Sequence, residues 1–192
     1  MELKFHGGRY FLPGLAIICS VILLDQYTKW LVIDLLRSPA VVHPGFLQWL
    51  TSLSKISLLT GPEDFNHKTL SPFLNFVMVW NKGISFGMMD NKYPHMAGIF
   101  IVLSLTIALI LTVWLALSTQ KIVTVALALI IGGALGNVAD RVRFDAVEDF
   151  IDFHLAQYHW PAFNVADSCI VIGAGILMLV SLLGKEDAKR TT

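Results

Sequence analysis

Charged residues are scarce in this chain, and their scarcity excludes an ordinary soluble domain. Of its 192 residues only 15% are charged, whereas 55% are hydrophobic, and the mean hydropathy is +0.67, well outside the usual soluble range. Lys plus Arg equals Asp plus Glu at 14 each, so no excess charge indicates a nucleic acid or an acidic partner. We therefore expect a membrane protein that binds no nucleic acid.

Cysteine is also rare, which excludes a disulfide framework. Cys19 and Cys169 are the two cysteines, and both lie inside apolar runs, where thiols are usually buried and inert. Neither has an evident histidine partner, so a cysteine nucleophile is not indicated. No internal repeat or low-complexity segment is evident either, and the length allows one compact domain over residues 1–192.

Long apolar runs, in contrast, are plentiful. A helix that crosses a bilayer needs about 20 apolar residues, and four runs approach or exceed this length. They cover about residues 11–33, 96–117, 122–138 and 165–183. The first run follows Lys4 and Arg9, as a signal peptide would, but it is too long and has no small-residue cleavage site. We expect it to be retained as a membrane span.

The distribution of basic residues favours one orientation. If both termini are cytoplasmic, the inside holds Lys4, Arg9, Lys121, Lys185, Lys189 and Arg190, and the outside holds Arg37, Lys55, Lys68, Lys82, Lys92, Arg141 and Arg143. Six against seven does not decide by count, but the inside charges crowd into short tails and one tight turn, where positive charge orients a chain most strongly. We expect both termini in the cytoplasm, with residues 34–95 and 139–164 outside.

The longer outer stretch contains two predicted elements. Apolar residues recur at helical spacing from Phe46 to Ile56, which predicts either an amphipathic helix on the membrane surface or a loop helix that caps the bundle. Residues 73–80 alternate imperfectly, and Asn81-Lys82-Gly83 has turn character before Ile84-Ser85-Phe86. This pattern predicts the short strands of a hairpin.

Polar residues inside the spans suggest how the helices pack. Asp25 and Lys29 are four residues apart on one helix face and can form an ion pair, for which we expect a structural role. Gly132, Gly133 and Gly136 place small residues on neighbouring turns of the third span, which lets another helix approach closely.

Two aspartates stand at the edges of apolar segments. Asp149 precedes Phe150-Ile151, and Asp167 begins the last span, three residues after Asn164, whose amide can cap the helix or contact that carboxylate. Carboxylates at membrane depth are costly and indicate function by default. Two that meet would share one proton and activate a water molecule.

A metal site is the alternative interpretation of the acidic residues here. Five carboxylates occur within thirteen residues, namely Asp140, Asp145, Glu148, Asp149 and Asp152. Hard cations prefer such ligands, but the spacing is not that of a calcium loop and the histidines are scattered. We expect most of these carboxylates to be solvated loop residues, with no metal and no cofactor bound. Asp140 and Arg141 could form an interface ion pair or orient a catalytic group.

The motifs together resemble one family, the lipoprotein signal peptidases, which are the type II signal peptidases of bacteria and intramembrane aspartic proteases. The resemblance covers about residues 10–183. Its motifs are Asp25-Gln26-Tyr27-Thr28-Lys29, Asn75, Asn81-Lys82-Gly83-Ile84-Ser85-Phe86, Gly132-Gly133-Ala134-Leu135-Gly136-Asn137-Val138-Ala139-Asp140-Arg141, Asp149-Phe150-Ile151-Asp152-Phe153 and Phe163-Asn164-Val165-Ala166-Asp167. Each motif alone is weak, but all of them in this order are specific.

The resemblance implies a function and a set of residues. It implies that Asp149 and Asp167 are the catalytic pair, that Asp140 supports them, and that binding or bracing residues are Asn75, Asn81, Gly83, Asn137, Arg141 and Asn164. It also implies an all-α membrane protein with four transmembrane helices, a small extracytoplasmic β-sheet cradle and a surface amphipathic helix. The implied substrate is a prolipoprotein with a diacylglyceryl cysteine, cut on the amino side of that cysteine. The enzyme would be a monomer in the inner membrane, in contact with lipid.

The chain departs from the family pattern at three places. Glu148 stands where an apolar residue is usual, Ile84-Ser85 replaces a pair of small residues, and the stretch from Arg37 to Pro72 is longer than usual. None of these touches the aspartate pair.

Two other classes of protein stay open. A proton-coupled carrier could use Asp25, Lys29 and Asp167 as a relay, but it does not explain the hairpin motif or the clustered asparagines. A structural assembly factor explains the small-residue packing and little else. The sequence also leaves open which aspartate of the pair is protonated at rest.

Overall fold

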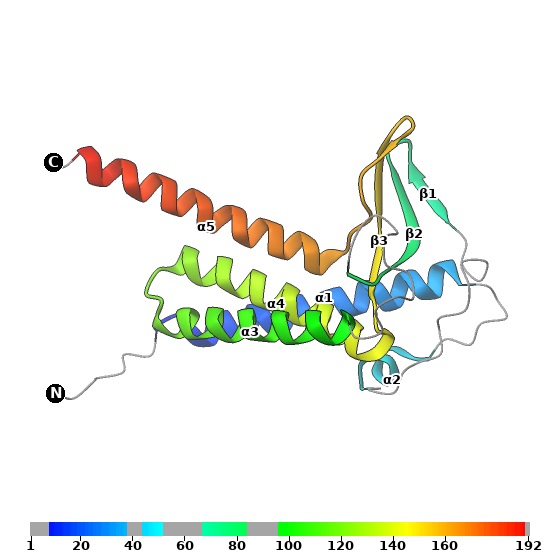
Figure 1. Cartoon of the computed structure of the whole chain (residues 1–192), viewed down its shortest axis with the longest axis horizontal. Helices are drawn as coiled ribbons and strands as arrows, with labels where there is room; N and C mark the ends of the chain where they lie inside the picture. The colour runs from blue at the N-terminus through cyan, green and yellow to red at the C-terminus, as the bar shows by residue number, and fades with distance from the viewer. Residues whose placement is uncertain (1–7, 38–43, 52–66, 84–95, 191–192) are drawn as a thin grey trace.

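The fold is seen in a computed structural model of the whole chain, which describes residues 8–37, 44–51, 67–83 and 96–190. Within these residues the chain order is α1 (Phe11–Leu36), α2 (Phe46–Thr51), β1 (Lys68–Ser71), β2 (Leu74–Asn81), α3 (Met96–Leu117), α4 (Lys121–Phe144), β3 (Val147–Leu155), β4 (Tyr158–His159) and α5 (Val165–Arg190). The long helices α3, α4 and α5 extend to the left in Figure 1, whereas the small sheet stands upright at the right, on the same side as α2 and the last turns of α1.

In the described part of the chain, four helices are long and apolar enough to cross a membrane, namely α1, α3, α4 and the first 19 residues of α5. Each of the four predicted apolar runs therefore forms a long helix. Helix α4, which corresponds to the third predicted span, continues to Phe144, six residues past the predicted end. Asp140 and Arg141 therefore belong to a helix rather than to a loop. The start of α1 and the end of α5 both lie at the end of the bundle away from the sheet (Figure 1).

Helix α4 is the centre of the bundle, because its small residues admit two neighbours. A Cβ atom on Gly132 would lie 2.7 Å from Val21 Cβ in α1, and one on Gly133 would lie 2.4 Å from the Ala166 carbonyl oxygen in α5. Real side chains do not tolerate such distances, so the glycines permit the close approach that their spacing predicts. The outer faces of α3 and α5 expose many large apolar side chains, as lipid-facing surfaces do.

The sheet is antiparallel with the strand order β1-β2-β3-β4, so the term all-α would be too loose for this fold. Strand β2 pairs with β1 through a turn at Pro72-Phe73 and with β3 on its other edge. The hairpin expected from residues 73–80 is therefore formed with the preceding strand. The other predicted partner, Ile84-Ser85-Phe86, lies outside the described residues.

Helix α2 contains the first half of the predicted surface helix, whereas residues 52–56 lie outside the described range. Leu47 is 73% exposed, but Trp49 is fully buried and packs against Ile33 and Phe144. The guanidinium of Arg143 donates to the Trp49 carbonyl oxygen at 3.0 Å. One face of α2 is therefore anchored on α1 and α4, and the other is open.

Candidate active site

The two candidate aspartates come from different elements. Asp149 lies on β3, paired in register with Val79 of β2, and is almost fully buried. Asp167 lies in the first turn of α5 and is partly exposed. The chain between them folds back so that Phe163 pairs with Ile151, and this return places the start of α5 beside β3.

Asn164 connects the two carboxylates. Its Nδ2 donates to Asp149 Oδ1 at 2.8 Å. At the start of α5, its Oδ1 accepts from the Asp167 backbone N–H at 2.9 Å, and its own N–H approaches Asp167 Oδ2 at 3.4 Å. This reciprocal arrangement is a helix cap, as expected from the spacing of three residues. Because Asn164 is fully buried, the cap also fixes the direction of its amide.

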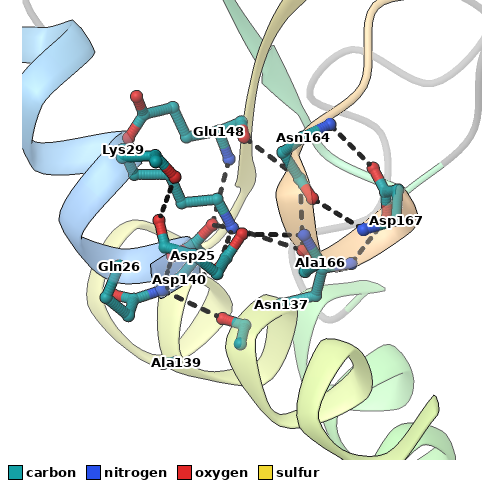
Figure 2. Close-up of polar contacts among 12 residues, drawn as sticks. Asp25, Gln26, Lys29, Asn137, Ala139, Asp140, Glu148, Asn164, Ala166 and Asp167 are labelled. Carbon is teal, nitrogen blue, oxygen red and sulfur yellow. Dashed lines mark hydrogen bonds and ion pairs between the residues drawn. The ribbon is translucent and has the colours of Figure 1, made fainter. Parts of the chain in front are cut away.

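Asn137 of α4 holds the other side of Asp167. Its Nδ2 donates to Asp167 Oδ1 at 2.8 Å, while its Oδ1 accepts from Asn164 Nδ2 at 3.2 Å. Figure 2 shows Asn137 between the buried ion cluster and the start of α5. The amide thus orients one candidate carboxylate from the transmembrane bundle.

Asn81 approaches Asp149 from the end of β2. Its Nδ2 donates to Asp149 Oδ2 at 2.9 Å, and its Oδ1 accepts from the Gly83 N–H at 2.8 Å, which confirms the predicted turn. Gly83 has φ +114°, and a Cβ there would lie 2.1 Å from the Phe100 ring. Only glycine fits this conformation and this space, so Gly83 fixes the amide that contacts Asp149.

The surroundings of Asp149 favour its neutral form. Burial is the largest cause and the nearby charge of Asp167 the second, and together they raise the pKa of Asp149 to about 7. Hydrogen bonds from Asn81 and Asn164 act in the opposite direction, because they stabilise the carboxylate. A carboxyl group poised near neutral pH can exchange a proton during a reaction.

A buried ion cluster lies beside the start of α5, to the left of Asn164 and Asp167 in Figure 2. Lys29 Nζ lies 2.7 Å from Asp25 Oδ2 and 2.6 Å from Asp140 Oδ2, and all three side chains are fully buried. Gln26 donates to both carboxylates, at 3.1 Å and 2.9 Å. The predicted pairing of Asp25 with Lys29 is confirmed, and Asp140 joins it from α4.

The cluster also reaches the candidate aspartates. Asp25 Oδ1 accepts from the Ala166 N–H at 2.9 Å, at the start of α5. Asp140 Oδ2 accepts from the Glu148 N–H at 3.3 Å, next to Asp149 on β3. The two carboxylates of the cluster therefore position the two elements that carry Asp149 and Asp167.

The arginines take other partners than the sequence suggested. Arg141 lies with its guanidinium 5.1 Å from the centre of the Phe100 ring and 3.5 Å from the Asn137 carbonyl oxygen, whereas Asp140 is bound by Lys29. Arg143 donates to the side-chain oxygen of Gln26. Gln26 and Arg143 were not predicted as site residues. The only sign of them in the sequence was that Gln26 follows Asp25 and that Arg143 lies two residues after Arg141.

The expectation of solvated carboxylates between residues 140 and 152 was wrong. Asp140, Glu148, Asp149 and Asp152 are buried, and only Asp145 of the five is exposed. Burial raises the pKa of Glu148 well above its usual value, and neither of its side-chain oxygens has a hydrogen-bond partner among the described residues. The segment is a central strand rather than a loop, which is why these side chains are enclosed.

Asn75 lies apart from the pair that it was expected to brace. It is in register with Asp152 and donates to Asp152 Oδ2 at 3.0 Å. His159 Nδ1 lies 2.8 Å from Asp152 Oδ1. Burial opposes ionisation of Asp152, but the hydrogen bonds from Asn75 and His159 outweigh it and lower the pKa of this group. Within the described residues, Asp152 forms with His154 and His159 the one group suited to hold a metal ion.

Comparison with known proteins gives one consistent result. The family described as signal peptidase (SPase) II matches residues 17–183. A lipoprotein signal peptidase of Polynucleobacter necessarius is 38% identical over 166 residues, which is 85% of each chain. Another from Aquifex aeolicus is 42% identical over 124 residues, 64% of this chain and 74% of that one.

Solved structures agree with these relatives. A bacterial membrane enzyme solved by the in meso method at 2.3 Å resolution superposes with a TM-score of 0.68 at 25% identity, and the match covers 95% of this chain and 94% of the other. A second, at 1.9 Å, gives a TM-score of 0.64 over 93% of this chain and 98% of the other.

Proposed function

We propose, because the chain belongs to the signal peptidase II family, that Asp149 and Asp167 are its catalytic pair. As a member of this family the protein is a membrane-embedded aspartic protease that removes signal peptides from prolipoproteins. The observation that carries the proposal is the set of asparagine contacts: Asn164 donates to Asp149 and caps the turn that holds Asp167.

The two carboxyl groups have different roles in this proposal, one as the acid and the other as the base. Asp149 has the raised pKa, so we assign to Asp149 the proton that the pair shares and to Asp167 the role of the base. Asp167 is also the more exposed of the two, which suits the group that meets water. Two like charges in one site do not both ionise easily, which keeps a single proton on the pair.

The reaction follows from this division. Asp167 accepts a proton from water as the water oxygen bonds to the scissile carbonyl carbon, while Asp149 donates its proton to the carbonyl oxygen. When the tetrahedral intermediate collapses, the C–N bond breaks and the proton on Asp167 passes to the leaving nitrogen. A hydroxyl proton of the intermediate returns to Asp149 as the carbonyl group re-forms, so the pair again holds one proton. The tightly held amides of Asn81, Asn137 and Asn164 keep both carboxyl groups oriented throughout.

The ion cluster is a positioning device in this proposal. Lys29 is enclosed by Asp25 and Asp140, so it has no free path to water, and the carrier interpretation gains no support from it. We assign to the cluster the role of holding β3 and α5 at a fixed distance from the bundle. Arg141, whose guanidinium packs on Phe100, lies beside the pair and stabilises negative charge there.

The substrate is proposed in finer detail from the resemblance and the fold. It is a prolipoprotein with a diacylglyceryl cysteine, cut on the amino side of that cysteine. The apolar outer faces of α3 and α5 would admit lipid chains from the bilayer, and the sheet would hold the peptide. Membrane lipid is thus a natural partner, and a monomer contains every residue of the proposed site.

Replacement of each aspartate by asparagine tests the catalytic assignment. Asp149→Asn and Asp167→Asn should each abolish cleavage of a lipopeptide, because asparagine neither donates nor accepts the required proton. Asp145→Asn is the matched control, since Asp145 is exposed and asparagine tolerates its left-handed backbone. Substantial turnover by either purified active-site variant, with a normal melting temperature, would rule out the assignment.

The topology proposed for the chain is a single membrane domain over residues 1–192 with both termini cytoplasmic. The number of candidate spans in the described residues is even, and the start of α1 and the end of α5 lie at the same end of the bundle (Figure 1). Both observations support this topology. In a variant without Cys19 and Cys169, a cysteine at the exposed Thr119 should react only from the cytoplasm, and one at the exposed Gln157 only from outside. The reverse pattern would overturn the orientation.

A further inference from the structure

A carboxylate and two imidazoles lie close together at the far end of the sheet, separate from the aspartate pair. Asp152 and His154 are on β3, and His159 is on β4 in register with His154. Side chains alternate along a strand, so Asp152 and His154 point to the face of β3 opposite to that of Asp149. The group therefore has no part in the proposed hydrolysis.

The spacing of the atoms is close to that of a metal site. The ligand atoms of the three residues all lie within 4.8 Å of one another, and His159 Nδ1 is 2.8 Å from Asp152 Oδ1. A tetrahedral zinc ion with bonds of about 2.1 Å needs ligand atoms about 3.4 Å apart. Side-chain rotations would have to bring the three atoms to that spacing, and the exposed position of His159 leaves room for one.

The hydrogen bonds show which atoms face the centre of the group. His154 Nδ1 lies 3.4 Å from Asn75 Nδ2, which itself donates to Asp152, so this ring nitrogen is on the side of the polar group. His159 Nδ1 faces the Asp152 carboxylate and carries a proton that a metal ion would replace. The two imidazole rings are stacked, with centroids 5.0 Å apart and planes 16° from parallel, which aligns both rings beside one carboxylate.

Asn75 offers a further ligand. Its Oδ1 is buried and has no hydrogen-bond partner among the described residues, whereas its Nδ2 is directed at Asp152 and His154. A half-turn of the side-chain amide exchanges the two atoms and directs the oxygen to the centre. Water could take the same position, as it does in many zinc sites with three protein ligands.

We propose that Asp152, His154 and His159 bind a divalent transition-metal ion of the zinc class. Two imidazoles and one carboxylate form a ligand set that suits zinc and not calcium or magnesium. The ion would tie the short β3–β4 hairpin together and fix the outer end of the strand that carries Asp149. The opposing explanation is a simple Asp152–His159 hydrogen bond beside two stacked rings.

Titration of the full-length protein with zinc chloride tests the site. The protein is purified in detergent without a polyhistidine tag, and binding is followed by calorimetry, with cobalt(II) absorption as a probe of tetrahedral geometry. We expect one saturable zinc ion per chain and a higher melting temperature in its presence. His154→Phe, which keeps a stacked ring, and His159→Phe, at an exposed position, should each weaken binding at least about tenfold.

His67→Ala is the matched control, since His67 is an exposed histidine that directly precedes β1. This variant should leave zinc binding unchanged. A melting curve without metal shows whether each variant folds. If His154→Phe does not fold, His159→Phe still tests the site, because His159 is exposed. Absence of saturable zinc binding, or equal affinity in wild type and both phenylalanine variants, would overturn the proposal. None of these measurements depends on peptidase activity, so the metal site and the catalytic pair succeed or fail separately.

Discussion

Asn164 Nδ2 lies 2.8 Å from Asp149 Oδ1, across the boundary between the sheet and the last transmembrane helix. This contact, together with the cap that the same residue forms with Asp167, means that one buried amide sets the relative position of both proposed catalytic groups. The geometry of the site therefore depends on residues that take no part in proton transfer.

Replacement of Asn164 should accordingly impair catalysis more than binding. Asn164→Ala removes the contacts to both carboxyl groups, and a misplacement of about 1 Å costs roughly 100-fold in rate. We expect kcat on a lipopeptide to fall by about that factor with little change in KM. Asn164→Asp keeps the helix cap but adds a negative charge, and it should be at least as inactive. Near-normal kcat in the alanine variant would show that the amide is not needed to position the pair.

The pH dependence of the reaction should report the proton on Asp149. Its pKa is raised to about 7 by burial and by Asp167, so the neutral acid is present below pH 7 and is lost above it. We expect kcat to fall as pH rises through about 7. Asn81→Ala removes a hydrogen bond that favours the ionised form, so the pKa should rise further and the alkaline fall should move to higher pH.

Asn75→Ala is the control for that experiment, because Asn75 lies on the same strand but contacts Asp152. The alkaline limb should stay in place in this variant. A limb that moves equally in both asparagine variants, or in neither, would mean that it reports a group other than Asp149.

Asp140 should matter for stability first. Asp140→Asn leaves Lys29 with one charged partner, and loss of a partner from a buried ion pair costs up to about 3–5 kcal/mol. Since Asp25 still pairs with Lys29, we expect a smaller loss, seen as a melting temperature lower by several degrees, with part of the activity retained. The exposed Asp34–Arg37 pair is the control, and Asp34→Asn should cost about 0–1 kcal/mol. Complete inactivity of Asp140→Asn at an unchanged melting temperature would move Asp140 into the chemistry.

Glu148 should destabilise the protein at neutral pH. Its buried oxygens have no hydrogen-bond partner in the described part of the chain, and burial raises its pKa far above the usual value. The unfolded chain loses this proton above about pH 4.5 whereas the folded chain keeps it, so the destabilisation grows as pH rises above 4.5. Burial without a partner costs at least about 1 kcal/mol, and 1 kcal/mol corresponds to about 2–4 °C in a chain of this size.

Glu148→Gln should therefore raise the melting temperature at pH 7 by at least about 2 °C, and the gain should shrink toward pH 4. Melting of both proteins across this range separates the effect of Glu148 from other titrating groups, because those groups are common to both. A lower melting temperature for Glu148→Gln at pH 7 would indicate that the carboxylate has a charged partner after all.

How far the sequence predicts the site depends on how many residues separate the two partners of each contact. The Asp25–Lys29 pair and the Asn164–Asp167 cap were predictable because both follow from helical spacing. The contacts of Lys29 with Asp140 and of Arg143 with Gln26 join residues more than 100 positions apart, and no local pattern contains them. The four spans were predictable from hydropathy, but the end of α4 was not, since its last turns are polar and buried.

The histidines and Trp49 illustrate the same limit. His154 and His159 looked scattered in the sequence, and only the short β3–β4 turn brings them side by side. Trp49 interrupts the expected apolar stripe of α2 because that face packs against Phe144 instead of lipid.

One motif in the chain is typical of a different catalytic group, a nucleophilic serine. Gly83-Ile84-Ser85-Phe86-Gly87 has the Gly-x-Ser-x-Gly spacing found at some nucleophilic serines. The motif follows β2, but residues 84–87 lie outside the described residues, so the structure does not test a serine there. Membership of an aspartic protease family favours the carboxyl groups, and Ser85→Ala should leave cleavage intact.

The open face of α2 provides a test of how substrate reaches the site. Leu47 is 73% exposed whereas Trp49 is fully buried, so α2 has one anchored face and one open face, on which Leu47 is the large apolar residue. We propose that this open face rests on lipid and helps to admit the lipidated substrate. Removal of a leucine side chain from water contributes about 1.5–3 kcal/mol, and 1.4 kcal/mol corresponds to a tenfold change in affinity.

Leu47→Asp should therefore raise KM for a lipopeptide at least about tenfold and leave kcat nearly unchanged. Gln48→Asp is the matched control, because Gln48 is the adjacent exposed residue and already polar, so the same charge there should have little effect. Trp49→Ala should act differently and lower the melting temperature, since its ring packs 5.2 Å from that of Phe144. If Leu47→Asp and Gln48→Asp change KM equally, or if neither changes it, α2 is a connecting element that caps the bundle and takes no part in substrate capture.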